Sequence, residues 1–124
     1  MKETDIINHP DHYKADFPPV EIECIDITRH LPFTVGNAFK YLWRAGRKDP
    51  EKTLEDARKA LWYLRDALHH EMKSVCPAAR AVFKLIPETR THRWAAMFCI
   101  VSDSLVMAER HVALWIEELE NDKD

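Results

Sequence analysis

The chain has 124 residues, of which 46% are hydrophobic and 31% are charged, a balance typical of one globular domain. The formal net charge of −3 excludes the overall basic character of many nucleic-acid-binding proteins, so we expect no nucleic-acid partner and only local anion sites. Only two glycines occur, which excludes both the Gly-rich phosphate loop and the dinucleotide-binding fingerprint.

The first segment of the chain, residues 1–19, is polar and holds three of the seven prolines, as the sequence shows. Proline removes a backbone donor and fixes φ, so we expect an extended arm rather than a helix. The arm has no apolar run of the signal-peptide type, and no stretch approaches the ~20 apolar residues of a membrane span. We therefore expect a cytoplasmic protein without a membrane partner.

Helical spacing of apolar residues begins after the arm. It predicts a short helix over residues 20–31, which Pro32 ends. A second helix is expected over residues 35–45, with Thr34 as its N-cap and Gly46 as a left-handed cap at its end.

A third helix is expected from Pro50 to about Lys73, with Asp49 as its N-cap and the proline in the first helical position. Its apolar stripe predicts antiparallel packing on the second helix. A short helix over residues 78–85 follows between prolines. The three cysteines are too far apart for zinc spacing and odd in number, so we expect reduced and mostly buried thiols at Cys24, Cys76 and Cys99.

The remaining residues, 89–121, read as one long helix that keeps a 4-3 apolar alternation for more than three heptads. Apolar residues also occupy other faces of this helix, which predicts cover on more than one side. We expect a homo-oligomer held through this C-terminal helix. The alternative is that the first three helices supply all of the cover.

The segment GNAFKYLWRAGRK carries the most chemistry. On a helix its polar members share one face, with Lys48 following at the turn. The set combines an amide, cations and a phenol, which suits phosphates and a stacked base; the alternative is a solvated helix face. The predicted ligand-binding residues on this helix are Asn37, Lys40, Tyr41, Arg44 and Lys48.

The third helix carries a second polar line, which includes Asp56, Lys59 and Tyr63. In an antiparallel pair this line can border the basic face. Asp56 could then orient Arg44 or Lys48, and Lys59 could add to the anion site. The alternative is ordinary salt bridging within the helix, worth about 0.3–0.5 kcal/mol per pair.

The arm contains the sequence NHPDHY, in which His12 and Tyr13 could lie over a ligand bound nearby. A histidine pair beside a proline is a weak metal signal, and we expect no metal site. We also expect no cofactor apart from a nucleotide, which would be the ligand or the substrate.

Three pieces of the sequence together resemble a known family: P-x-HY in the arm, then GNAxKYLxRxGxK, then DxxKAxWYL. The family is a small phage domain of unknown function that includes the deoxynucleoside monophosphate kinase of a short-tailed coliphage. The resemblance covers roughly residues 8–65. It implies nucleotide binding first and phosphoryl transfer second, in the cytoplasm of an infected bacterium.

These observations predict an all-α protein, a small helical bundle with an extended N-terminal arm and a long C-terminal helix. We expect a single nucleotide-binding domain over residues 1–124, made of the arm (1–19), a family core (20–73) and a C-terminal helical extension (74–124) for oligomerisation.

The leading hypothesis is a kinase-like nucleotide-binding protein with Asp56 and Lys59 as catalytic residues. The alternatives are a non-enzymatic sponge that sequesters a signalling nucleotide of host antiviral defence, and a helical protein-interaction module. A metal-dependent pyrophosphatase is disfavoured, because only Glu117-x-x-Glu120 resembles its paired carboxylate motifs.

Overall fold

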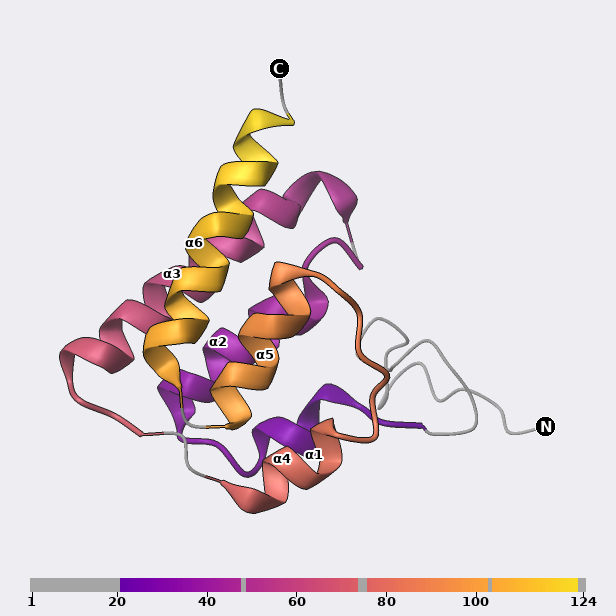
Figure 1. Cartoon of the computed structure of the whole chain (residues 1–124), viewed down its shortest axis with the longest axis vertical. Coiled ribbons are helices and arrows are strands. Elements are labelled where there is room, and N and C mark those ends of the chain that lie inside the picture. The colour runs from indigo at the N-terminus through magenta and orange to yellow at the C-terminus, as the bar shows by residue number, and fades with distance from the viewer. Residues whose placement is uncertain (1–20, 48, 74–75, 103, 123–124) are drawn as a thin grey trace.

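Six α-helices form the described part of the chain in the computed structural model, which covers residues 21–47, 49–73, 76–102 and 104–122 (Figure 1). The predicted all-α fold is confirmed for these residues, whereas the predicted arm lies outside them. None of the described helices combines the length and apolar character needed to cross a bilayer. The helices are α1 (Cys24–Thr28), α2 (Phe33–Arg44), α3 (Thr53–His69), α4 (Pro77–Phe83), α5 (His92–Val101) and α6 (Leu105–Asn121), with a short 3-10 helix η2 (Pro50–Lys52) before α3.

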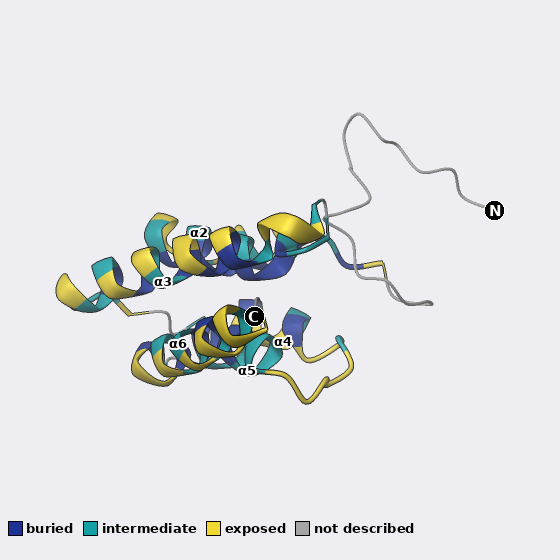
Figure 2. Ribbon diagram, turned by 90° about the horizontal axis from the view of Figure 1, so that it is seen from above, coloured by how far each residue is buried: buried dark blue, intermediate teal, exposed yellow. Residues whose placement is uncertain are grey.

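The helices are arranged in two layers (Figure 2). One layer contains the pair α2 and α3, whose antiparallel packing agrees with the prediction, and the other contains α4, α5 and α6. The layers turn their buried sides toward each other and their exposed sides toward solvent. Each helix therefore needs only one broad apolar face to join the core.

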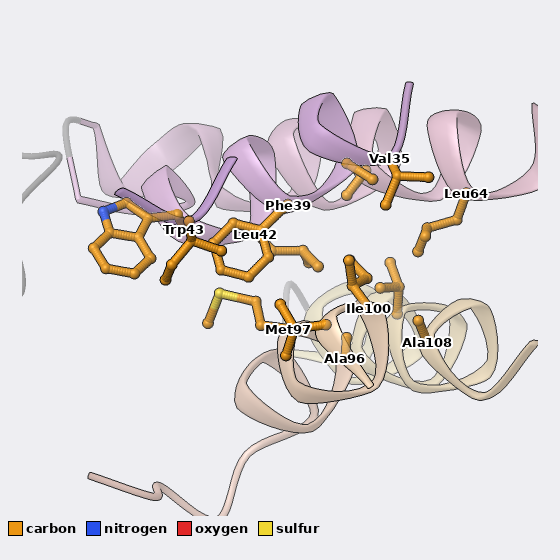
Figure 3. Close-up of a cluster of buried hydrophobic side chains, with 14 of the residues drawn as sticks. Val35, Phe39, Leu42, Trp43, Leu64, Ala96, Met97, Ile100 and Ala108 are labelled. Carbon is orange, nitrogen blue, oxygen red and sulfur yellow. The ribbon is translucent and has the colours of Figure 1, made fainter. Parts of the chain in front are cut away.

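The core between the layers consists of side chains from both of them (Figure 3). Phe39 and Leu42 of α2 and Leu64 of α3 face Ile100 of α5 and Ala108 of α6, and all five are fully buried. Phe39 also contacts the rings of Trp43 and Phe83, at centroid distances of 6.0 Å in both cases. One continuous cluster thus holds the two layers together.

The first two helices differ from their predicted bounds. The predicted 20–31 helix is shorter, because the Asp26 carboxylate accepts the backbone N–H of Glu23 at 2.9 Å and caps the start of α1 there. The predicted cap Thr34 is wrong, because α2 begins at Phe33 and the carbonyl of Pro32 accepts the N–H of Gly36 at 2.7 Å.

The turn from α2 to α3 follows the prediction in its capping residues, but the predicted helix start at Pro50 is a 3-10 turn and α3 itself begins at Thr53. Gly46 has a φ of +76°, the left-handed conformation expected of it. The carboxylate of Asp49 accepts the N–H of Glu51 at 3.0 Å, and Pro50 opens η2 directly after it. These local devices set the short connection between the two helices.

Replacing Gly46 with alanine is expected to lower the free energy of unfolding by about 1–2 kcal/mol. The left-handed φ disfavours a Cβ, and that atom would lie 2.7 Å from Oγ1 of Thr53. Gly36→Ala is the matched control, because its Cβ meets nothing closer than 3.7 Å and alanine favours a helix by up to about 1 kcal/mol. Urea unfolding of both variants measures the difference; an equal stability for the two would contradict the argument.

The end of α3 comes four residues earlier than the predicted Lys73. Glu71 adopts a left-handed φ of 53°, and the N–H of Met72 donates to the carbonyl of Ala67 at 2.9 Å. This is the hydrogen-bond pattern of a Schellman C-cap with a glutamate in the place that glycine usually takes. Because a glutamate takes this place, no glycine in the sequence indicates the C-terminal end of α3.

The predicted single helix over residues 89–121 is wrong. These residues form two helices, α5 and α6, which pack against each other as a hairpin. The N–H of Ser104 donates to the carbonyl of Cys99 at 2.8 Å, which ends α5, and the Ser104 carbonyl accepts from Ala108 in α6. Short polar side chains such as the serines at this break compete with helical hydrogen bonds, while the apolar stripe continues in phase across it.

The hairpin of α5 and α6 reduces the apolar surface that is left for a partner chain. In an unbroken helix the second apolar face needs a partner chain, but here α5 and α6 cover much of each other. Three apolar side chains of α6 stay exposed: Val106, Met107 and Leu114. A homo-oligomer therefore remains a prediction, based now on this smaller surface.

The expected burial of the three cysteines is found in full only for one of them. All three are free thiols; Cys24 is buried, whereas Cys76 and Cys99 are half-buried. Burial raises the pKa of the Cys24 thiol to about 12, against the smaller opposing effect of the Lys40 and Arg47 charges. Burial also raises the pKa of Cys99.

Because the thiolate is the reactive form, Cys24 of the folded protein is expected to stay unmodified by iodoacetamide at about pH 8 while Cys76 reacts first. Peptide mass spectrometry after a labelling time course measures this order. Labelling in denaturant, where all three should react, is the control. Equal rates for Cys24 and Cys76 in the folded state would contradict the burial of Cys24.

Candidate functional site

The side chains that the sequence analysis selected on α2 form a basic cluster around one aromatic ring. The Lys40 Nζ lies 4.7 Å from the centroid of the Tyr41 ring, and the Arg44 guanidinium carbon lies 5.9 Å from it. The helix produces this arrangement because residues three and four apart share a face. Both cations are half-buried.

Helix α3 adds a third cation and a second ring. The Lys59 Nζ lies 5.4 Å from the same Tyr41 centroid, and the ring of Tyr63 stacks on Tyr41 at 5.9 Å with an interplanar angle of 13°. The polar lines of the two helices therefore do border each other, as expected from their antiparallel packing. We call this set the Tyr41 cluster; it consists of Lys40, Tyr41, Arg44, Lys59 and Tyr63.

The ring of Tyr41 is thus surrounded. Its surroundings are a stacked phenol from α3 and three cationic groups within 6 Å, at 4.7, 5.4 and 5.9 Å from its centroid. Cations over a ring face are attracted by its quadrupole, which holds their flexible side chains near one point. The stacked Tyr63 ring already lies against one face of this tyrosine, which leaves less ring surface for a base.

The positive charge of the cluster is only weakly neutralised. Lys59 has Glu55 at 4.0 Å, an exposed pair at the limit of an ion contact. Among the described residues, neither Lys40 nor Arg44 forms an ion pair. The Nε of Arg44 is moreover buried without a hydrogen-bond partner. An anion that accepts from this guanidinium would satisfy a donor that the fold leaves open.

Asp56 is placed differently from the expectation. It is the only buried charged residue in the described part of the chain, with 6% of its surface exposed. The expected ion pair between Asp56 and Arg44 is absent from the described contacts, so an orienting role toward this arginine has no geometric support. The expected partner Lys48 lies outside the described residues.

The other predicted ligand residues fall into two groups. Asn37 is half-buried on α2, one turn before Tyr41, and no contact to the Tyr41 cluster is recorded for it. His12 and Tyr13 lie outside the described residues, as Lys48 does. Over the described ranges, no three histidine, cysteine or acidic side chains gather in a way that could hold a metal ion.

The end of α2 is fixed by Arg93, a residue that no sequence pattern indicates. Arg93 of α5 donates from Nη2 to the carbonyl of Trp43 at 2.7 Å and from Nη1 to the carbonyl of Ala45 at 3.2 Å. A cation at the carbonyl end of a helix is favourable for its dipole. The contact joins residues about fifty positions apart, so no local pattern signals it.

These residues define an all-α protein with a cationic, aromatic cluster on the outer side of one helical pair. Residues 7–65 match the model of a family described as a protein of unknown function, DUF3310. The match spans just under half of the chain and includes every member of the Tyr41 cluster. No curated protein and no solved structure matches the chain.

Proposed function

We propose that the protein binds a nucleotide through its phosphate groups at the Tyr41 cluster. The observation that supports this most directly is the convergence of three cations from two helices on one ring. Three like charges held this close repel one another. A bound polyanion would neutralise them and be attracted to all three. Guanidinium and ammonium groups together suit phosphate oxygens, and the unsatisfied Nε of Arg44 adds a directed donor.

A kinase-like reaction is the form of this proposal that the family resemblance favours. The γ-phosphorus of a nucleoside triphosphate would lose its bond to the bridging oxygen and form one to a phosphate oxygen of a nucleoside monophosphate. Lys59 would compensate the charge that develops on the transferred group, and Asp56 would orient the acceptor. Both nucleotides are present in the cytoplasm of an infected bacterium.

A non-enzymatic nucleotide sponge is the second candidate. The observation that favours it is the burial of Asp56 without a described cation partner, since this leaves the cluster rich in binding groups but poor in acid–base groups. A tight cationic site is sufficient to sequester a signalling nucleotide of host defence.

Native mass spectrometry of freshly purified protein tests nucleotide binding and self-association together. A co-purified mass that corresponds to a nucleotide is the expected result, and the subunit count reports whether the exposed apolar side chains of α6 hold a homo-oligomer. The affinity should fall steeply with salt, because the cations are partly exposed. A protein that binds no nucleotide at low salt would contradict the proposal.

Replacing Asp56 with asparagine separates the two candidates. In a kinase the variant should lower turnover about 10- to 100-fold while nucleotide affinity stays within about threefold. In a sponge only the affinity changes, and the bound nucleotide is recovered intact after heat denaturation. Binding itself should survive EDTA in both cases, because cationic side chains of the cluster neutralise the phosphates. A strict magnesium requirement for binding would contradict both.

A further inference from the structure

A hollow of about 450 Å³ opens between the C-terminal end of α2, the segment after α4, and the helices α5 and α6. Its volume lies within the range of about 300–1,000 Å³ that small-molecule pockets have. The wall is largely aromatic and apolar, with Trp43, Phe83, Trp94, Met97 and Trp115 among its residues. An adjoining hollow of about 670 Å³ shares Trp94 and Trp115 with it.

The tryptophans of this wall differ in their contacts with other aromatic rings. The ring of Trp43 contacts Phe39, and the ring of Trp94 stacks on Phe98 at 5.3 Å with an interplanar angle of 6°. Trp115 is half-buried and makes no ring contact with another aromatic residue of the described chain. It packs partly against the core and also lines both hollows, so part of its side chain borders open space. The Trp94 Nε1 is buried and has no hydrogen-bond acceptor, so an acceptor nearby would satisfy it.

The two hollows differ in the charged residues that line them. Arg47 and Arg93 line the first hollow, and the Arg47 guanidinium carbon lies 5.3 Å from the centroid of the Trp43 ring. Residues of both signs line the adjoining hollow: Glu88, Glu118, Arg90 and His92. An anionic group of a ligand is therefore favoured in the first hollow, beside Arg47 and Arg93.

Arg47 also connects the hollow to the basic side of α2. It follows the end of α2 directly, three residues after Arg44, and its backbone N–H donates to the Arg44 carbonyl at 2.9 Å. Arg44 belongs to the Tyr41 cluster, whose ring is already contacted by Tyr63 and by three cations. For a nucleotide with its phosphates at the α2 cations, this hollow supplies a second and larger aromatic surface beside Arg47.

We propose that the aromatic hollow binds the planar base of a nucleotide, with Trp115 as the stacking surface and the phosphates directed toward Arg47 and the cations of α2. This inference rests on the proposed nucleotide binding. It assigns a site to the base, the part of the ligand that the Tyr41 cluster does not recognise. Four aromatic residues and two arginines on one wall give a site for a planar aromatic anion rather than for a simple lipid or a metal ion.

The test compares Trp115→Leu with Trp62→Leu, a matched control because Trp62 is 62% exposed on α3 and does not line the hollow. Affinities are measured by calorimetry for the four common deoxynucleoside monophosphates and for inorganic pyrophosphate. Loss of one base–aromatic stack should weaken nucleotide binding about 5- to 100-fold in Trp115→Leu, with pyrophosphate binding unchanged. The Trp62 ring contacts Tyr63 of the Tyr41 cluster at 5.1 Å, so any effect of Trp62→Leu should be equal for nucleotides and pyrophosphate.

A second measurement avoids any change to the core. In the Trp62→Phe protein, every remaining tryptophan lines the hollow, and nucleotides should quench the fluorescence where pyrophosphate does not. Nucleotide binding that is unaffected by Trp115→Leu and gives no quenching would overturn the inference while the proposed function stands. Quenching by nucleosides in a protein that ignores pyrophosphate would instead support the hollow and overturn phosphate binding at the Tyr41 cluster. A protein that binds neither probe overturns both.

Discussion

Replacing Arg44 with alanine is expected to weaken nucleotide binding about 30- to 1,000-fold, which corresponds to about 2–4 kcal/mol. The guanidinium is half-buried, carries an unsatisfied Nε and forms no ion pair with the described acidic residues. Its loss would remove a charge-assisted contact without freeing a buried acid. Calorimetry at low salt gives the affinity of each variant for each nucleotide that the original protein binds.

Two further variants sharpen this prediction. Arg58→Ala is the control for charge alone, because Arg58 is an exposed arginine of α3 that pairs with Glu120 at 2.7 Å outside the Tyr41 cluster. It should change affinity by less than about threefold. Arg44→Lys should fall between the two, because lysine keeps the charge and loses the bidentate geometry. Unchanged affinity in Arg44→Ala would remove this residue from the site.

Phe39→Ala is expected to lower the free energy of unfolding by about 3–5 kcal/mol, the largest effect of a single substitution that we predict. The side chain is fully buried between the layers and contacts both Trp43 of its own helix and Phe83 of the other layer. Its removal leaves a cavity that neither layer can fill alone. Urea unfolding followed by circular dichroism measures the change.

Phe33→Ala provides the matched control, since it is the same substitution in the same helix at a position that is 82% exposed. We expect it to alter stability by no more than about 0.5 kcal/mol. If Phe39→Ala costs as little as Phe33→Ala, the two layers do not share the core described above.

The parts of the fold that the sequence predicts are those with local signals. Gly46 must adopt a positive φ, and Asp49 followed by Pro50 marks a helix start, so the turn between α2 and α3 could be read residue by residue. The faces of these two helices follow from the 3.6-residue period. Together these signals predict that the polar face of α3 with Lys59 borders the face of α2 with Tyr41, and in the structure these two residues are in contact.

The features that the sequence does not predict depend on contacts between distant segments. The break between α5 and α6 is hidden because the apolar stripe keeps its phase across Ser102 and Ser104, and only the hairpin packing decides where the helix ends. Arg93 reaches the end of α2 from the other layer, and no pattern near it indicates this. The burial of Asp56 likewise has no signal in the residues around it.

The shared core also bears on how proteins of different length can be built on this region. Residues 7–65 include α1, α2 and most of α3 but nothing of the second layer. In a polypeptide that ended there, Phe39, Leu42 and Leu64 would meet water instead of α5 and α6. The matched region therefore supplies one wall of the core, and residues 77–121 supply the opposite wall.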